Sequence, residues 1–295
     1  MKTTKLGDAS LSVALYSGLL LFSLFTLYPF LNILAVSLND KIDTIRGGIY
    51  LWPRVWSMQN YTEIFANPNL LGAFLMSVLR TVVGTVLGIL CTALFAYALS
   101  AKEFMYRKLF NGMLVITLYV NGGLIPTYLL IKNLELMNTF WVYILPLLIS
   151  GFYVIIMRSY FESLPDGLIE SAKIDGAGHF QTLFRIVIPV SLPVLATITL
   201  FVAVLHWNSW FDNYLYASRE QSLSLLQYEL MKILLSAMNQ SATQQAHISE
   251  NTVNIVNPQS VRAAMTIIVT VPILLVYPFL QRYFVKGMTV GAMKE

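Results

Sequence analysis

Six long apolar stretches limit what this 295-residue chain can fold into more than any other feature. They cover about residues 11–37, 72–100, 109–131, 139–159, 188–207 and 262–284. A helix that crosses the ~30 Å hydrocarbon layer needs about 20 apolar residues, and its backbone groups must bond to one another because lipid offers no partner. The sequence therefore predicts an all-α, polytopic membrane protein with six transmembrane helices, in which residues 1–295 form a single domain.

The charge content argues against the main alternative, a soluble protein. Only 12% of the residues are charged and 57% are hydrophobic, whereas a soluble domain carries about 25% charged residues. A chain with so few charges cannot surround an apolar core with a polar shell, so its apolar side chains must face lipid. The net charge of +4 comes without a Lys/Arg stripe, and we expect no nucleic-acid partner.

The distribution of basic residues indicates how the helices are oriented. Eleven Lys and Arg lie in the segments on the side of the two termini, and eight lie in or near the segments on the opposite side. Because basic residues are enriched in cytoplasmic loops, both termini are predicted to be cytoplasmic. The first apolar stretch is longer than the ~7–15 residues of a signal-peptide core, so we expect it to remain as a span.

Groups typical of catalysis are absent from the predicted spans. Cys91 is the one cysteine, the three histidines lie far apart, and there is no phosphate-binding G-x-x-x-x-G-K-[ST] motif. We therefore predict no catalytic residue, no metal site and no cofactor bound by this chain. The alternatives are a stand-alone or ion-coupled carrier, which usually contains internal repeats, and a polytopic membrane enzyme, which needs paired ionisable groups in its spans.

The segment 163–189, between the fourth and fifth stretches, predicts two short helices joined by a bend. Ser163 is expected to be the N-cap of the first helix, with Pro165 and Asp166 in its first turn. Gly176 and Gly178 are expected to end that helix, where a left-handed residue is needed. This is the predicted cytoplasmic coupling loop.

The second helix of this loop has an amphipathic pattern. Its apolar face is predicted to contain Phe180, Leu183, Phe184 and Val187, and Pro189 is predicted to begin the next span. An amphipathic helix in a cytoplasmic loop lies on the membrane surface or docks in the groove of a partner protein. Few basic residues flank this helix, which makes a partner groove at least as favourable.

The same loop contains a longer pattern, which consists of Glu170, Ser171, Ala172, Gly176, Ile186, Ile188 and Pro189. It resembles the coupling motif of permease subunits of binding-protein-dependent ATP-binding-cassette (ABC) importers, with Ser171 in place of Ala and Ile188 in place of Leu. Other stretches resemble the carbohydrate-uptake branch of this family, in particular a maltose-type second permease of systems that import oligosaccharides. They are Asn121–Pro126, Leu136–Trp141, His206–Trp210 and Arg282–Gly287.

The resemblance implies a subunit that moves oligosaccharides by alternating access across a bacterial cytoplasmic (inner) membrane. In that family a second homologous permease, two ATPase subunits that hold ATP and Mg, and an extracellular solute-binding (lipo)protein complete the importer. The residues implied to couple to the ATPase are Glu170, Ala172, Asp175, Gly176, Phe180, Leu183, Phe184 and Pro189. A local bond to Lys173 is the alternative role for Glu170.

A substrate pathway is predicted from side chains suited to sugars, which combine aromatic faces with amide and hydroxyl groups. At the outer end of the fifth stretch these are Trp207, Asn208, Trp210, Asp212, Asn213 and Tyr214. The alternative for this cluster is the aromatic belt of a membrane interface.

Two further positions in the spans are candidates for this pathway. Asn121, Gly122 and Gly123 interrupt the third stretch, where they open a polar notch or permit close helix packing. Arg80 near the outer start of the second stretch is a candidate ligand for an acidic sugar, or it extends its charge to the interface.

Overall fold

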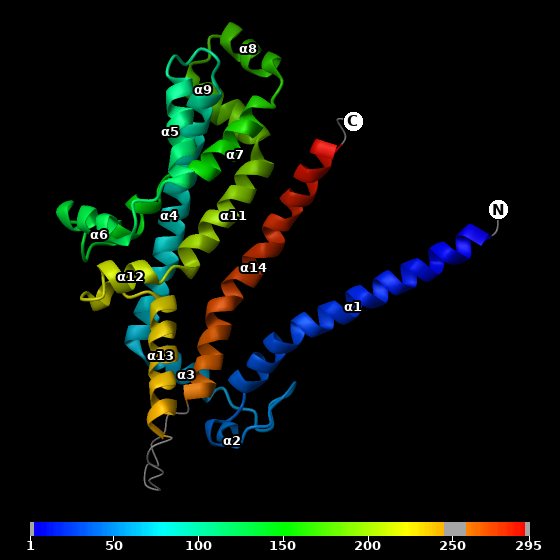
Figure 1. The fold of residues 1–295 in the computed structure, drawn as a ribbon, viewed down its shortest axis with the longest axis vertical. Helices are drawn as coiled ribbons and strands as arrows, with labels where there is room; N and C mark the ends of the chain where they lie inside the picture. The colour runs from blue at the N-terminus through cyan, green and yellow to red at the C-terminus, as the bar shows by residue number, and fades with distance from the viewer. Residues whose placement is uncertain (1–2, 245–257, 293–295) are drawn as a thin grey trace. The chain divides into compact units, whose positions relative to one another are not determined.

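The computed structural model describes residues 3–244 and 258–292, and these residues form helices without any strand (Figure 1). The predicted all-α class is therefore confirmed. The chain divides into two compact units. Unit 1 contains Met1–Leu71 and Leu230–Val271, and unit 2 contains Gly72–Glu229 and Pro272–Glu295.

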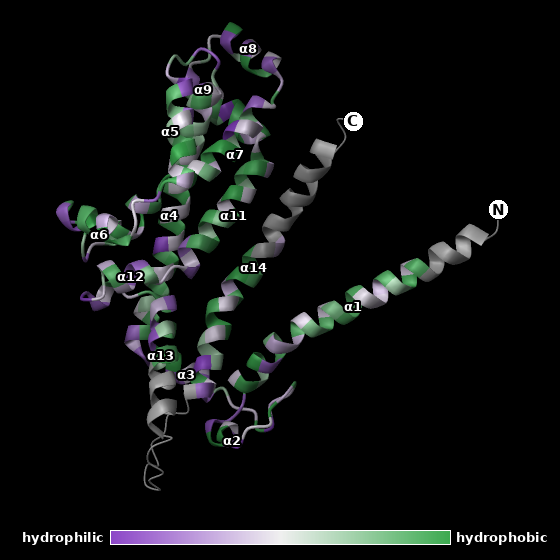
Figure 2. Cartoon of the chain, in the orientation of Figure 1, coloured by the Kyte–Doolittle hydropathy of each residue, from purple (hydrophilic) through white to green (hydrophobic). Residues whose placement is uncertain are grey.

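Three helices are unbroken and have an apolar part long enough to cross a membrane. They are α1 (Thr3–Ser37), α4 (Pro68–Ser100) and α14 (Pro258–Ala292). Three bent pairs of helices also qualify, which gives up to six spans in the described part of the chain. Every side chain of residues 11–31 in α1 is exposed, and Figure 2 shows the apolar character of this helix. A helix that is apolar on all sides needs lipid or a partner around it.

The third predicted span is divided into α5 (Arg107–Tyr119) and α6 (Leu124–Asn133), which meet at an angle of 120°. Gly123 adopts the left-handed region with φ +85°, and its N–H donates to Asn121 Oδ1 at 2.9 Å. A Cβ atom added at Gly122 or Gly123 would meet nothing within 4 Å. Gly123 therefore permits the bend, and no continuous helix covers 109–131.

The fourth span is also bent, by 51° between its short 3₁₀ turns, η1 (Phe140–Tyr143) and η2 (Leu145–Leu147), and α7 (Gly151–Glu162). Pro146 lies at the start of η2, where its missing N–H removes no intrahelical hydrogen bond. The helical run before the fifth span consists of α9 (His179–Thr182), the π-helical turn η3 (Leu183–Val187) and α10 (Ile188–Val190).

The bend that begins the fifth span lies at Ser191, where this run meets α11 (Leu192–Asn208) at 86°. The prediction that Pro189 begins the span is therefore wrong. The π-helical turn accommodates Pro189 within the run, and Pro193 occupies the second position of α11.

The core of unit 2 is formed by α4, α7, η3 and α11. Its fully buried side chains include Ala96, Leu99, Val154, Met157, Leu183, Val187 and Ile198. At Gly84, α4 comes so close to α11 that an added Cβ would lie 2.5 Å from His206 Nε2. Close packing of helices thus depends on Gly84, because a small residue lets the backbones approach.

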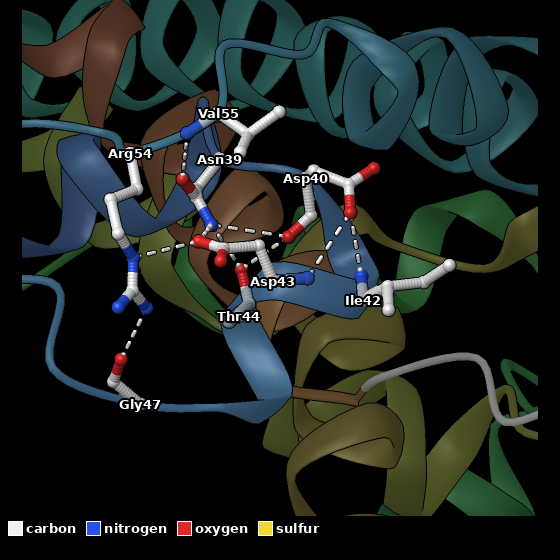
Figure 3. Close-up of polar contacts among 8 residues, drawn as sticks. All are labelled: Asn39, Asp40, Ile42, Asp43, Thr44, Gly47, Arg54 and Val55. Atoms are coloured by element: carbon white, nitrogen blue, oxygen red, sulfur yellow. Dashed lines mark hydrogen bonds and ion pairs between the residues drawn. The ribbon is translucent and has the colours of Figure 1, made fainter.

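The segment after α1 in unit 1 contains α2 (Lys41–Ile45) and α3 (Gln59–Ala66) and is organised by Asn39. Figure 3 shows the Asn39 amide donating to Asp43 Oδ2 and Thr44 Oγ1, both at 3.0 Å, while it accepts the Val55 N–H at 2.9 Å. Arg54 Nε donates to Asp43 at 3.0 Å. The hydrogen bond from Asn39 and the adjacent Arg54 guanidinium lower the pKa of Asp43. Both contacts therefore favour the ionised form of the Asp43 carboxyl group.

Candidate functional site

The coupling loop contains α8 (Asp166–Ile174), which ends at the predicted bend. Gly176 has φ +80°, a conformation that favours glycine, and its N–H donates to Lys173 O at 3.1 Å. The prediction of Ser163 as N-cap is wrong. Ser163 follows α7, its hydroxyl donates back to Tyr160 O at 2.7 Å, and Pro165 occupies the N-cap position.

The second helix of the loop does not present one apolar face. Leu183 and Val187 are each 1% exposed and pack in the core of unit 2, whereas Phe180 is 71% exposed and Phe184 is also exposed. The predicted grouping assumed the 3.6-residue period of an α-helix. The π-helical turn η3 has a wider period and changes which side chains share a face.

Six of the eight predicted coupling residues are exposed, namely Glu170, Asp175, Gly176, Phe180, Phe184 and Pro189. Ala172 and Leu183 are buried within the chain itself and offer no docking surface. Lys173 Nζ donates to Glu103 Oε1 at 2.8 Å, and no ion pair joins it to Glu170 among the described residues. Ile174, which the sequence interpretation missed, is 85% exposed beside the bend.

Arg80 is fully buried and forms an ion pair with Asp212 of α12 (Phe211–Tyr216). Its Nη1 donates to Ser209 O at 3.2 Å, and its guanidinium carbon lies 4.8 Å from the centre of the Tyr143 ring. The side chain therefore does not extend to an interface. Its charge is already matched by Asp212, which argues against its predicted role as a free cation for an acidic sugar.

Three other predicted pathway residues have structural contacts. Asn213 is fully buried and accepts the Leu225 N–H at 3.0 Å, just before α13 (Leu226–Gln244), near the 3₁₀ turn η4 (Gln221–Leu223). Trp207 is buried and packs edge-on against Phe74, with ring centroids 6.2 Å apart. Tyr214 is exposed and contacts neighbouring aromatic rings. These side chains connect the elements of unit 2.

A cavity of about 630 Å³ brings the remaining pathway residues together at the break between α5 and α6. The side chains in its lining that carry polar groups are Asn121, Thr127, Asn208, Ser209, Trp210, Asp212 and Tyr216. Gly122 lies beside the cavity and does not line it, whereas Gly123 does. A volume of ~300–1,000 Å³ with a few convergent polar groups is typical of a small-molecule site. The sequence interpretation included Asp212 in the sugar-binding cluster but assigned no role to Thr127.

Metal chemistry has no candidate site in the described residues. Within 3–244 and 258–292, no group of three or more His, Cys, Asp or Glu side chains is placed to hold a metal ion.

Residues 19–290 match the family described as binding-protein-dependent transport system inner membrane component. Polygalacturonan/rhamnogalacturonan transport system permease protein YtcP of Bacillus subtilis is 34% identical over 95% of this chain and 96% of the relative. Protein LplC of the same organism is 36% identical over 91% of this chain and 90% of the relative. The crystal structure of a bacterial ABC transporter that imports the acidic polysaccharide alginate contains a chain with 26% identity and a TM-score of 0.83, covering 94% of this chain and 98% of that one.

These relatives are transport permeases and not enzymes, and the match extends over nearly all of the chain. The bent spans and the coupling loop therefore belong to a transport subunit. The chain is a member of the family of inner membrane components of binding-protein-dependent ABC transport systems.

Proposed function

We propose that this chain is one of two permease subunits of a bacterial ATP-driven oligosaccharide importer, and that residues 1–295 act in it as one transmembrane domain. The observation that best supports this proposal is the bend at Gly176. It lies in a loop with the spacing of the coupling motif, and Ile174 and Phe180 are exposed on either side of it. Exposed apolar side chains in a polar loop need a partner surface to cover them. The named transport systems of the relatives support a saccharide substrate.

The partners follow from this assignment. Two ATPase subunits hold ATP and Mg, and one of them receives the α8–α9 bend in a groove. A second permease pairs with this chain, and an extracellular solute-binding protein delivers the oligosaccharide. Since the coupling loop must face the cytoplasmic ATPases, and six spans place both ends of the chain on one side, both termini are cytoplasmic.

The mechanism uses the ATPase as the source of motion. Closure of the ATP-bound subunits displaces the docked bend, and the rigid core around Leu183 and Val187 transmits this displacement to α4, α7 and α11. The spans then change between inward-facing and outward-facing arrangements, which is alternating access. Hydrolysis of ATP by the partners resets the cycle.

The substrate pathway includes the cavity at the break of the third span. Trp210 offers an aromatic face, while Asn121 and Asn208 offer amide groups to sugar hydroxyls. Asp212 also lines this cavity, and Arg80 behind it keeps the carboxylate oriented. A carboxylate accepts hydrogen bonds from hydroxyl groups, so Asp212 offers an acceptor to the hydroxyl groups of the sugar.

Crosslinking tests the coupling role. In a background without Cys91, Phe180→Cys and Ile174→Cys are each expected to crosslink to the ATPase in the purified importer, because both side chains are exposed beside the bend. Ser218→Cys is the control, since it is exposed in the turn after α12. Products are identified by mass spectrometry. Failure of both loop cysteines to join an ATPase in an active importer contradicts the proposal.

Uptake kinetics test the cavity. Trp210→Ala is expected to raise the KM for oligosaccharide uptake by about fivefold, because it removes an aromatic face worth about 1 kcal/mol in stacking. Trp141→Ala is the matched control, since Trp141 is exposed and does not line this cavity. Uptake is measured in proteoliposomes that contain the complete importer and its binding protein. An unchanged KM in Trp210→Ala would remove this residue from the substrate pathway.

A further inference from the structure

Helix α8 is joined at both of its ends to the turn that follows α4. Lys102 Nζ lies 2.8 Å from Asp166 Oδ2 and 3.1 Å from Oδ1 in the first turn of α8. Glu103 Oε1 accepts a hydrogen bond of 2.8 Å from Lys173 Nζ in the last turn. Two adjacent residues of one turn, Lys102 and Glu103, therefore hold opposite ends of the coupling helix.

An open space lies between these two segments. A cavity of about 260 Å³ separates them, lined on the α4 side by Tyr97, Ser100, Lys102 and Glu103, and on the α8 side by Asp166, Ile169, Glu170 and Lys173. Ala172 is the one fully buried side chain in the described α8. Two ion pairs cross this gap, Lys102–Asp166 and Glu103–Lys173.

The positions of the charges fix the direction of α8. Asp166 and Lys173 are seven residues apart, which is about 10 Å along a helix that rises 1.5 Å per residue. A single ion pair leaves a helix free to pivot, whereas two pairs at this separation oppose rotation. The turn carries Lys102 followed by Glu103, and α8 carries Asp166 followed by Lys173. Both pairs of opposite charges can form only when α8 runs in the observed direction.

Both pairs remain charged in neutral solution. The hydrogen bond and charge of Asp166 raise the pKa of Lys102, and the contact with Lys173 lowers the pKa of Glu103. Glu103 in turn raises the pKa of Lys173. Because these side chains are largely exposed, their attraction is screened by salt and adds little to folding stability.

We propose that Lys102 and Glu103 act as a clamp that couples displacement of α8 to α4. Resting on the proposed function, this assigns them as positioning residues and names α4 as the span that receives the motion. Helix α4 ends at Ser100, two residues before the clamp, and also carries Arg80. The Arg80–Asp212 ion pair then links α4 to the wall of the cavity proposed for the sugar.

Charge reversal tests the clamp in the complete importer, reconstituted with its partner permease, ATPase subunits and binding protein. Lys102→Glu and Glu103→Lys are each expected to reduce oligosaccharide uptake per ATP hydrolysed by at least about fivefold, the lower range of a coupling effect. The neutral variant Lys102→Gln is also expected to reduce uptake per ATP hydrolysed, but by less than the charge reversals do. The unfolding temperature of the complex is expected to stay unchanged.

Restoration of the ion pair separates the clamp from other effects of the charges. Lys102→Glu combined with Asp166→Lys is expected to recover most of the uptake per ATP. Lys108→Glu is the matched control, because Lys108 is exposed near the same turn and has no ion pair among the described residues. It is expected to leave the ratio unchanged.

The outcomes distinguish the clamp from the proposed coupling role. Phe180→Cys is crosslinked to the ATPase in each variant. Retained crosslinking with a reduced uptake ratio supports the clamp. Retained crosslinking with normal uptake per ATP in both Lys102→Glu and Glu103→Lys overturns the clamp. The clamp is also overturned if Lys102→Glu combined with Asp166→Lys fails to recover uptake per ATP. Absence of crosslinking from both Phe180→Cys and Ile174→Cys, in an active importer with Lys102 and Glu103 intact, overturns the proposed function itself.

Discussion

Replacement of Arg80 by methionine is expected to prevent stable assembly of the protein in the membrane. Arg80 is fully buried, and its removal leaves the carboxylate of Asp212, which is 18% exposed, without its counter-charge. Breaking a buried ion pair on one side costs about 3–5 kcal/mol, a large part of the 5–15 kcal/mol that typically separates folded from unfolded protein. The Ser209 carbonyl and the Tyr143 ring also lose their contact with the guanidinium.

The measurement is the amount of protein in the membrane and its thermal unfolding in detergent. Arg219→Met is the matched control, because Arg219 is exposed in the same unit and is expected to tolerate the change. The unfolding temperature of Arg80→Lys should lie between those of Arg80→Met and Arg219→Met, since lysine keeps the positive charge but lacks the paired N–H donors of the guanidinium. Combining Arg80→Met with Asp212→Asn should recover stability. A normal unfolding temperature in Arg80→Met alone contradicts this account of the pair.

The second large effect is expected at the bend of the coupling loop. Proline at position 176 cannot adopt the observed φ of +80°, because its ring fixes φ near −65°. It also removes the N–H that donates to Lys173 O. Gly176→Pro therefore displaces Phe180 relative to α8 while leaving the buried core of unit 2 in place. Uptake per ATP is expected to fall at least about tenfold, while ATP hydrolysis continues.

Uptake and phosphate release are measured on the same vesicles, so that uncoupling is distinguished from loss of protein. Gly176→Asn is the control, because asparagine tolerates the left-handed region. It is expected to keep most of the coupling. Normal uptake in Gly176→Pro would show that the geometry of this bend does not transmit motion from the ATPase.

Much of the fold could be predicted from the sequence because lipid imposes a strict requirement on the backbone. Long apolar runs must be helices in a membrane, so the all-α class and the six-span expectation followed from length and composition. The coupling loop was found by local signals, a glycine at the bend and a motif of fixed spacing around Glu170. These features depend on residues close together in the chain.

The tertiary structure decided which side chains meet and which remain exposed. Arg80 pairs with Asp212 across 132 positions and Lys102 with Asp166 across 64, and a local pattern does not specify such partners. Leu183 is buried and Phe180 is exposed, although their spacing of three residues would place them on one side of a regular helix. Apolar length therefore determined that the chain crosses the membrane. Long-range packing determined how its charges are paired, because a buried charge bonds to whatever the fold brings within reach.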